Sequence, residues 1–407
     1  MNDTPPRRRS LPVLTALAGL LVLVSTYLVH QQISRVGRYG DERHHLRQIE
    51  SFCEGRLELY GKLTTIPGYH VLAALTGRAL GGCSLEVARG VNTVFGLVSV
   101  LVFLLAARRA GSERPLLRTL QYFFLPILLP YYFLAYTDVS SVLLILVSLW
   151  LLVSKRPRAA GFVGDASLLV RQNNVAWLFF LGLYLLVEER LWAGWRGRIF
   201  GYLKRVWPAW LGMAAFLLFL ILNGSVVLGE RKAHRLGIYT ANVFFALFCY
   251  AIVFLPSVAA RLWRSRRRLL DPRLLGLVAL GLVLYLTTFD GGHPYNQFAG
   301  FLRNDLLKAM DRQLWVRLAF YLPVALALAA LALTRLQGPA RTALYPFALL
   351  LLLPSWLVEP RYYIIPFVLL LLFREDEKPW VEALSVPWSA LLSAFVLYGI
   401  ASGRFGL

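Results

Sequence analysis

The residues best suited to chemistry lie between Tyr39 and Cys53, where the sequence reads Tyr-Gly-Asp-Glu-Arg-His-His-Leu-Arg-Gln-Ile-Glu-Ser-Phe-Cys. Asp41 and Glu42 follow soon after a long apolar run and stand beside two histidines and several arginines. A charge cluster at the rim of a membrane costs desolvation energy unless its members are paired or line a wet cavity. The segment therefore predicts a polar cavity that holds a carboxylate able to act as a general base.

The rest of the chain must supply the scaffold of such a cavity. Of its 407 residues, 58% are hydrophobic and only 16% are charged, which is too apolar for an ordinary soluble domain. Apolar runs near the roughly 20 residues that span a bilayer recur along the chain. They lack the alternation of a membrane barrel, so the spans are expected to be helices. The predicted fold class is an all-α polytopic membrane protein that forms a single domain over residues 1–407.

The net charge of +21 comes mostly from short basic loops between the apolar runs. This distribution is typical of the positive-inside rule and argues against nucleic acid as a partner. Arg7, Arg8 and Arg9 precede the run Leu11–Val29. That run is too long for a signal peptide and lacks a clear cleavage site, which favours an anchored first helix with a cytoplasmic N-terminus.

Alternating basic loops predict about 13 membrane helices. They are expected at residues 11–29, 90–107, 117–134, 139–153, 158–171, 174–188, 206–222, 238–257, 272–289, 314–334, 341–357, 362–373 and 387–402. Residues 30–89 form the first external segment. A full span at Ile66–Leu80 would place Arg108 and Arg109 outside, so this helix is expected to lie at the interface or to tuck back into the protein. Pro126 and Pro130 are expected to kink their helix.

This topology gathers the unusual polar residues on one face of the membrane. The external segments carry Asp41, Glu42, His44, His45, Asp138, Arg171, Gln172, Asn173, Asn174, Glu230, Arg231, Lys232, His234, Asp290, His293, Arg303, Asn304, Asp305, Glu359, Arg361 and Tyr362. Converging arginines suit a phosphate, because the guanidinium offers a planar fork to its oxygens. We expect a lipid phosphate to enter this cavity with its tail in the bilayer.

The same residues fall into motifs in a fixed order along nearly the whole chain. They are Asp41-Glu42-x-x-His45-x-x-Gln48 followed by Phe52-Cys53, Lys62-Leu63-Thr64-Thr65-Ile66-Pro67-Gly68, Arg171-Gln172-Asn173-Asn174, Asn223-Gly224-Ser225 followed by Gly229-Glu230-Arg231-Lys232-Ala233-His234, His293-Pro294-Tyr295, and Leu357-Val358-Glu359-Pro360-Arg361-Tyr362. In these motifs the chain resembles the dolichyl-phosphate-glucose-dependent α-1,2-glucosyltransferases, which add the last glucose to the lipid-linked N-glycan precursor. The family's motif after His-Pro-Tyr is not preserved, and Arg303-Asn304-Asp305 is its nearest remnant.

The resemblance implies a GT-C-like bundle and an inverting transfer. Its donor would be a hexose, glucose by the resemblance, on polyprenyl (dolichyl) phosphate, and its acceptor a lipid-linked oligosaccharide or another glycan. The site would face the periplasm of a bacterium or the lumen of the endoplasmic reticulum. Two rival functions stay open, namely a transporter or flippase for lipid-linked sugars and an inactive lipid-binding subunit. A transporter often shows internal repeats, and the sequence has none that we can see.

Inversion needs a carboxylate on the acceptor side, for which Asp41 is the first candidate and Glu42 the second. The alternative role for Asp41 is structural, as the N-cap of the following helix. The candidate substrate-binding residues are His45, Gln48, Lys62, Thr64, Thr65, Arg171, Gln172, Asn174, Arg231, His234, His293, Arg303, Glu359, Arg361 and Tyr362. For the arginines the alternative is pairing with Glu230, Glu359 or Asp138 to tether helices.

The sequence gives little support to a metal site or a cofactor. Asp41 and His45 share a helix face, but no third ligand accompanies them. Cys53, Cys83 and Cys249 lack metal-like spacing. A Cys53–Cys83 disulfide requires an oxidising side, and buried free thiols are the preferred interpretation. The tyrosines at 131–136 and 362–363 are expected to anchor the chain at the membrane interface.

Overall fold

The computed structural model describes residues 10–190 and 195–407, and this part of the chain is built from helices and loops. Its α-helices are α1 (Ser10–Ile33), α2 (Glu42–Cys53), α3 (Gly68–Ala79), α4 (Leu85–Arg109), α5 (Pro115–Phe123), α6 (Asp138–Val153), α7 (Pro157–Leu168), α8 (Val175–Glu188), α9 (Trp195–Asn223), α10 (Ala241–Val253), α11 (Leu255–Arg264), α12 (Pro272–Thr288), α13 (Leu302–Arg312), α14 (Leu314–Ala332), α15 (Leu344–Leu352), α16 (Ile364–Phe373) and α17 (Pro379–Ala401). Short 3-10 helices lie at Leu129–Phe133, Gln172–Asn174, Arg231–His234, Arg266–Leu270, Pro294–Gln297, Pro339–Ala343 and Pro360–Tyr363.

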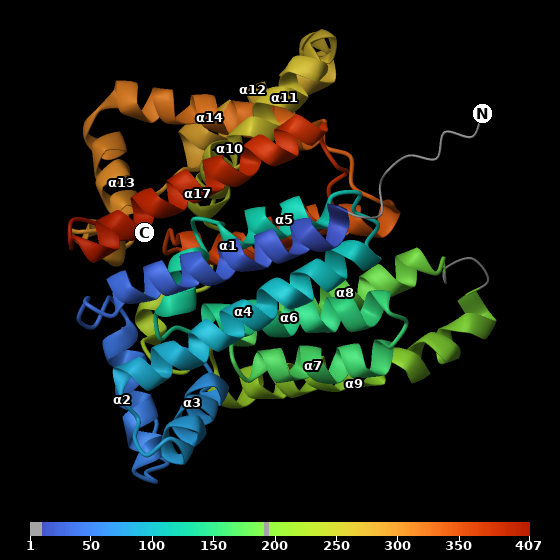
Figure 1. The fold of residues 1–407 in the computed structure, drawn as a ribbon. Helices are drawn as coiled ribbons and strands as arrows, with labels where there is room; N and C mark the ends of the chain where they lie inside the picture. The colour runs from blue at the N-terminus through green and yellow to red at the C-terminus, as the bar shows by residue number, and fades with distance from the viewer. Residues whose placement is uncertain (1–9, 191–194) are drawn as a thin grey trace.

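Most helices run along one common direction (Figure 1). Helices α4, α6, α7, α8 and α9 form one group, and α10, α14 and α17 form another, with α1 and α5 between them. Helices α2 and α3 cover one end of the bundle, which we call the Asp41 end. The basic loops after α4 and α16 lie at the opposite end, which we call the Arg374 end.

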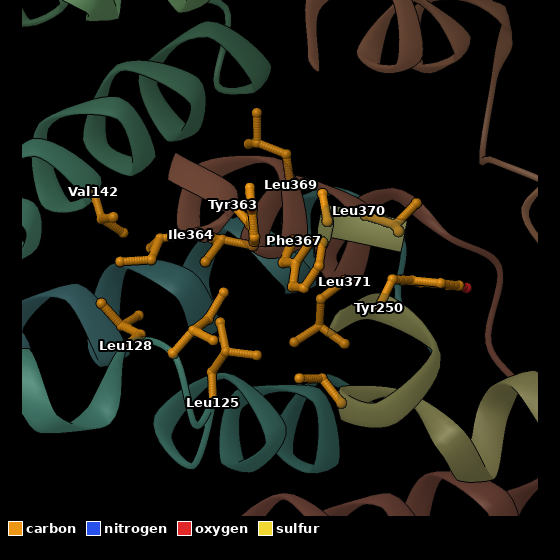
Figure 2. Packing of buried hydrophobic residues seen from close by; sticks show 14 of the residues in the cluster. Leu125, Leu128, Val142, Tyr250, Tyr363, Ile364, Phe367, Leu369, Leu370 and Leu371 are labelled. Carbon is orange, nitrogen blue, oxygen red and sulfur yellow. The ribbon is translucent and has the colours of Figure 1, made fainter. Parts of the chain in front are cut away.

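The centre of the molecule is the short helix α16, whose sequence Ile-Ile-Pro-Phe-Val-Leu-Leu-Leu-Leu-Phe is apolar on every face. A helix that is hydrophobic all round is expected to be buried on all sides. Nine of its ten residues are buried, and they pack against Leu125, Leu128, Val142 and Tyr250 (Figure 2). Because ten residues of α-helix extend only about 15 Å, α16 links the two ends of the core without the length of a full membrane span.

The prediction of about 13 full spans is wrong in length rather than in order. Among the described residues, five helices are long and apolar enough to cross a membrane, namely α1, α4, α9, α14 and α17, and the pair α10–α11 would make a sixth if it were one span. That pair bends by 86°. The other predicted spans in the described ranges form helices that are shorter than the roughly 20 residues of a full membrane span. The predicted span at 117–134 ends at Phe123, since Pro126 and Pro130 interrupt the backbone ladder more completely than the predicted kink. The chain is a multi-pass membrane protein that also contains several apolar helices shorter than a full span.

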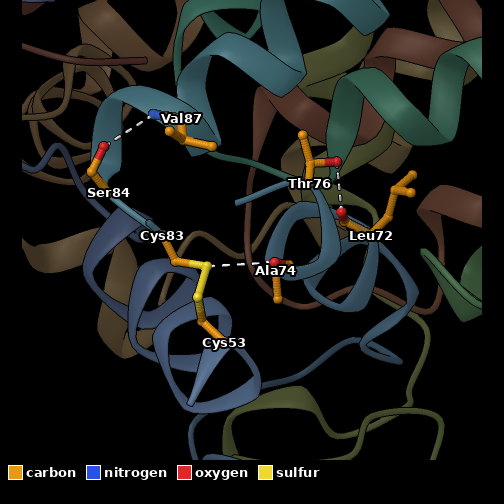
Figure 3. Close-up of a disulfide and its surroundings, with 7 residues drawn as sticks. All are labelled: Cys53, Leu72, Ala74, Thr76, Cys83, Ser84 and Val87. Carbon is orange, nitrogen blue, oxygen red and sulfur yellow. Dashed lines mark hydrogen bonds between the residues drawn. A yellow bond between two sulfur atoms is a disulfide. The ribbon is translucent and has the colours of Figure 1, made fainter. Parts of the chain in front are cut away.

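The segment before α4 is held to the bundle by a covalent bond. Cys53 at the end of α2 and Cys83 just before α4 form a disulfide, with a Cα–Cα distance of 6.2 Å (Figure 3). Our preference for buried free thiols at these positions was wrong, because α3 returns the chain so that both cysteines meet. Helix α3 has 12 residues, which at about 18 Å is too short to cross a bilayer. The disulfide fixes α2, and the segment before it, relative to α4.

Candidate active site

Asp41 is presented by a tight turn that the local sequence permits. Gly40 has a φ of +52°, and a Cβ there would lie 2.5 Å from the hydroxyl of Tyr136. Glycine is therefore required by both the backbone conformation and the space. The Tyr136 hydroxyl accepts a hydrogen bond from the Asp41 backbone N–H at 2.8 Å. Asp41 occupies the N-cap position of α2 but makes no side-chain cap bond, so its carboxylate remains free to point elsewhere.

The Asp41 carboxylate points to Arg361, with Oδ2 and Nη2 3.1 Å apart. The same Arg361 nitrogen lies 3.2 Å from Glu359, and Glu359 also pairs with Arg303 at 3.0 Å. These residues form a row of alternating charges, Asp41–Arg361–Glu359–Arg303. The Asp41 side chain is 49% exposed, whereas that of Glu359 is 2% exposed. Only Asp41, at the open end of the row, is accessible to a substrate.

A second ion pair faces the first across a small cavity. Arg171, just before α8, pairs with Asp138 at the start of α6. Arg171, Asp138, Arg361 and Tyr362 all line one cavity of about 20 Å³. That volume holds about one water molecule, so a phosphate would have to open the cavity or replace a carboxylate. The predicted convergence of Arg171 and Arg361 near Asp41 is therefore present in the structure, with each arginine paired to an acid.

The electrostatics of the site keep its acids ionised and its histidines neutral. Burial alone would raise the pKa of Asp41, but the charge and hydrogen bond of Arg361, together with His45 and His44, hold that pKa below its usual value. The pKa of Glu359 is likewise lowered, since Arg303 and Arg361 overcome its burial. Burial lowers the pKa of His45 to about 4 despite the nearby Asp41. Asp41 therefore carries a negative charge at neutral pH and could accept a proton.

Glu42, the second candidate for the base, is fully buried and its oxygens are occupied. Oε1 and Oε2 accept from Nε and Nη2 of Arg89 at 2.9 and 2.6 Å. They also accept from the backbone N–H groups of Ala135 and Tyr39 at 2.7 and 2.8 Å. A carboxylate with these four bonds has no lone pair left for a hydroxyl acceptor. The geometry favours Glu42 as a tie between α2, α4 and the segment before α6.

Several predicted substrate-binding amides also serve the fold. Gln48 binds the backbone of Glu58 and Tyr60. Gln172 accepts from Ile66 N and donates to the carbonyls of Thr64 and Val226. The Asn174 amide bonds to Ser141 and to the Ser167 carbonyl. These buried amides hold the loops around Asp41 in place, and they have little hydrogen-bonding capacity left for a sugar. Thr65 is half-buried beside them, and Lys62 is exposed.

The loop before α10 and the segment before α13 meet on the same side. The Tyr295 hydroxyl donates to Glu230 at 2.8 Å, and the rings of His293 and Trp356 pack edge to face at 4.8 Å. His234 is close enough to His293, Glu230, Arg361 and Asp41 to respond to their charges, although burial is the main reason that its pKa is lowered. Arg231 is exposed and bonds to Asn223 at 2.7 Å, away from the row of charges. His234 and His293 thus border the site, whereas Arg231 lies further out.

Comparisons with known proteins agree with this arrangement of motifs. The model of the DIE2/ALG10 family matches residues 36–196 and 192–372, which is most of the chain. The chain belongs to the DIE2/ALG10 family.

Members of this family align with the chain almost from end to end. The relative from Candida albicans is 26% identical, covering 88% of this chain and 89% of its own length. The relatives from Debaryomyces hansenii and Drosophila melanogaster are 24% and 26% identical, covering 86% and 88% of this chain. All three are named Dol-P-Glc:Glc(2)Man(9)GlcNAc(2)-PP-Dol alpha-1,2-glucosyltransferase.

One solved structure aligns with the chain at low similarity. The oligosaccharyltransferase of Archaeoglobus fulgidus aligns with a TM-score of 0.42 and 13% identity, over 95% of this chain and 56% of that one. The chain spans just over half the length of that protein. A likeness of this size carries no argument about function.

Sequence reasoning missed three residues of this DIE2/ALG10 site. His70 on α3 faces His45, with ring nitrogens 2.9 Å apart, and both rings are buried. Arg89 holds Glu42, and Tyr136 supports Asp41 while Arg361 lies 5.1 Å above its ring. Tyr136 was expected at the membrane interface with its tyrosine neighbours. That expectation was wrong for Tyr131, Tyr132, Tyr136 and Tyr363, which are buried inside the protein.

Arg89 directly precedes the predicted span at 90–107, and this position could have identified it, since an unpaired charge at the rim of a membrane is costly and implies a partner. No comparable signal marks His70, because a lone histidine on an apolar helix has no preferred partner in sequence. Within residues 10–190 and 195–407, no group of three or more His, Cys, Asp or Glu side chains is placed to hold a metal ion.

Proposed function

We propose that this protein transfers glucose from dolichyl phosphate glucose to the terminal glucose of a lipid-linked oligosaccharide, forming an α-1,2 linkage with inversion. The names of its near full-length relatives support the substrates and the linkage. The observation that carries the mechanism is the half-exposed Asp41 carboxylate, fixed by Arg361 beside the cavity that Arg171 shares.

In this mechanism Asp41 is the general base. Its free carboxylate oxygen accepts the proton of the acceptor 2-hydroxyl while that oxygen attacks C1 of the β-linked donor glucose. The bond between C1 and the phosphate oxygen breaks, and its electron pair leaves with dolichyl phosphate. The products are an α-glucoside, dolichyl phosphate and a protonated Asp41, which returns its proton to water. No atom or electron is left unbalanced.

We assign the phosphate of the donor to Arg361 and Arg171. Negative charge grows on the phosphate as C1 departs, and cations that are already in place stabilise it most in the transition state. Both arginines are paired with acids in this structure, so the donor phosphate would compete with Asp138 and Glu359 for them. His45, His234, His293 and Tyr362 would border the sugars. We assign Glu42, Gln48, Gln172 and Asn174 to positioning the loops rather than to substrate contact.

The same proposal places the reaction at the external face of the membrane. The basic loops lie at the Arg374 end, so the positive-inside rule makes that end cytoplasmic and the Asp41 end luminal, or periplasmic in a bacterium. The Cys53–Cys83 disulfide at the Asp41 end fits an oxidising compartment. We propose one GT-C-like domain in which residues 30–89 carry the base.

The test is a transfer assay with purified full-length protein in lipid nanodiscs. Labelled polyprenyl phosphate glucose is supplied with a synthetic lipid-linked glycan that ends in glucose, and the product is digested with an α-1,2-specific glucosidase. We expect label to appear on the acceptor and to be released by this enzyme. Label released by a β-glucosidase would contradict inversion. Donor that crosses the bilayer without any transfer would support the flippase instead.

A further inference from the structure

The Arg374 end contains a pocket that plays no part in the proposed transfer. Its volume is about 600 Å³, within the usual range for small-molecule sites. The C-terminal ends of α10 and α16 point toward it, whereas their N-terminal ends reach the Asp41 site. A helix of 10–13 residues extends about 15–20 Å, so the two sites lie on opposite sides of the core.

Arginines from two separate segments converge on this pocket. It is lined by Arg261, Arg264, Arg266, Arg267, Arg268 and Arg335. The acids at its wall are Glu375, Asp376 and Glu377. Asp376 is engaged by Arg118, which does not line the pocket, and Glu377 pairs with both Arg261 and Arg264. The lining therefore has three more arginines than acids, and Arg267, Arg268 and Arg335 are exposed and form no ion pair with the residues that the structure describes.

The pocket also borders apolar side chains that suit a membrane interface. Helix α11 turns by 86° from α10, so it departs from the common direction of the bundle. Its outer face carries Leu255, Ala259 and Trp263 at a spacing of four residues, and the Trp263 side chain is 74% exposed. Leu270, which follows the arginines, is 77% exposed. Such a helix lies in the plane of the interface, with its tryptophan at the level of the headgroups.

We propose that this pocket binds the phosphate-bearing headgroup of an anionic phospholipid in the leaflet at the Arg374 end. Basic pockets between helices on the cytoplasmic side are a known form of headgroup site. The positive-inside rule alone would explain basic loops, but it does not require two segments to aim their arginines into one cavity. Lys155 and Arg156, in another basic loop at this end, are exposed and do not line this pocket. The inference does not depend on the transfer reaction.

A pair of matched double variants tests the proposal. Arg267→Gln with Arg335→Gln removes one charge from each wall of the pocket, while Lys155→Gln with Arg156→Gln removes two charges elsewhere at the same end. Full-length protein in detergent micelles is titrated with fluorescent phosphatidylserine and, separately, phosphatidylcholine, at one salt concentration. Each basic residue near an anionic surface contributes about fivefold in affinity, so the pocket variant should bind phosphatidylserine roughly 25-fold more weakly than the wild type. The control variant should stay within about twofold.

Each other outcome overturns the proposal. Equal losses in the two variants would show general attraction to surface charge, and no loss in either would show that the pocket binds no lipid. Equal affinity for phosphatidylcholine would remove the requirement for an anion. Displacement of the lipid by inorganic phosphate at equal concentration would show that the pocket binds a soluble anion instead of a lipid headgroup. Unchanged thermal unfolding of both variants confirms that the comparison is made between folded proteins.

Discussion

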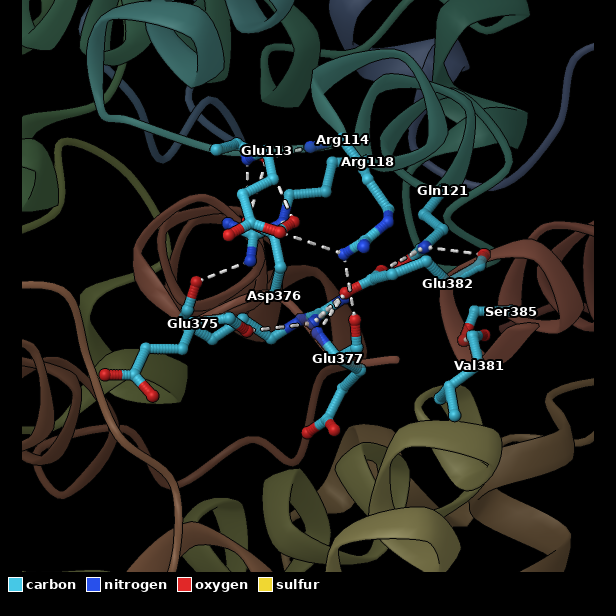
Figure 4. Close-up of polar contacts among 12 residues, drawn as sticks. Glu113, Arg114, Arg118, Gln121, Glu375, Asp376, Glu377, Val381, Glu382 and Ser385 are labelled. Atoms are coloured by element: carbon cyan, nitrogen blue, oxygen red, sulfur yellow. Dashed lines mark hydrogen bonds and ion pairs between the residues drawn. The ribbon is translucent and has the colours of Figure 1, made fainter. Parts of the chain in front are cut away.

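The two ends of the bundle each contain a network of arginines and acids, but the networks are built differently. At the Arg374 end, the four hydrogen bonds to the Glu382 carboxylate come from both terminal nitrogens of Arg374, from Gln121 and from the Glu377 backbone (Figure 4). Glu382 is fully buried. At the Asp41 end, Asp41 makes one ion pair and its side chain is half exposed.

The exposure of the carboxylate and the number of its bonds distinguish a structural network from a candidate site better than the number of charges does. Breaking a buried, fully bonded ion pair leaves an uncompensated charge in a low dielectric, so such a network holds the fold together. The network around Glu382 joins α5 and the loop after α16 to α17. The row from Asp41 to Arg303 is equally buried at its inner members but ends in an accessible carboxylate. We expect substitutions at the two ends to affect different quantities.

The largest effect is expected for Asp41→Asn, which keeps the shape of the side chain and removes its basicity. We expect transfer to fall by about 10²- to 10⁴-fold, the usual contribution of a positioned base. The temperature of unfolding should change little, because Arg361 keeps Glu359 as a partner. The rate of transfer and the thermal unfolding of purified protein check this prediction.

The matched control for Asp41→Asn is Glu58→Gln, an exposed acid on the loop after α2. It should retain full activity. Transfer by Asp41→Asn within a few-fold of the wild-type rate would show that Asp41 is not the base.

The opposite pattern is expected for Glu382→Gln at the other end. The neutral side chain leaves the buried Arg374 without its bidentate partner, so we expect a loss of about 3–5 kcal/mol in the free energy of unfolding. The catalytic rate of the protein that still folds should be unchanged. Glu375→Gln, which changes an exposed acid four residues before α17, controls for the loss of one negative charge. A stable Glu382→Gln protein with reduced kcat would contradict the division between the two ends.

The fold was predictable where one physical signal dominated. The sequence of α16 is apolar at almost every position, and the structure buries it on all sides. The predicted helix at 362–373 agrees with α16 to within two residues, but the sequence did not show that this helix is buried in the core, because an apolar run looks the same in a membrane span and in a short buried helix. The 86° turn between α10 and α11 was hidden for the same reason, since apolar residues continue through Phe254 and Leu255.

The candidate site was predictable where its residues lie in recognisable motifs. Asp41 and Arg361 are 320 positions apart in the sequence. The order of the motifs and the predicted external topology placed both residues in one site, and the structure shows them in contact. Which polar residues contact each other was not predictable. Gln48 and Gln172 resemble substrate ligands in the sequence, yet their side-chain amides bond to the backbone of loops. His70 reaches His45 only because α3 packs on α2, which the sequence does not show.

A moderate effect is expected for Arg361→Gln, which sharpens the distinction between phosphate ligand and tether. We expect kcat to fall by about 10- to 100-fold, the scale of a hydrogen-bond donor to developing charge or somewhat less. Stability should fall less than for Glu382→Gln, because Glu359 keeps Arg303 as a partner. Parallel measurements of kcat and thermal unfolding separate the two roles. A lower unfolding temperature with an unchanged kcat would identify Arg361 as a tether.

The smallest expected effect is a dependence of stability on pH. It arises from the buried histidines of the Asp41 end and distinguishes that end from the network at the Arg374 end. The pKa of His45 falls to about 4 through burial, and burial also places the pKa of His70 well below its usual value. Because the unfolded chain binds these protons more readily, their stabilising effect is complete above about pH 6.5 and is lost as the pH falls toward 4. Each histidine can contribute up to about 1.4 kcal/mol per pH unit in this window.

We therefore expect the unfolding temperature of the wild type to fall between pH 7 and pH 4.5, and to fall less steeply in His45→Gln. The glutamine amide can still bond to the ring of His70, so the variant should fold. His30→Gln, on the exposed end of α1, is the matched control and should keep the wild-type slope. An unchanged slope in His45→Gln would mean that His45 does not remain neutral in the folded protein, and that the acid sensitivity of the Asp41 end arises elsewhere.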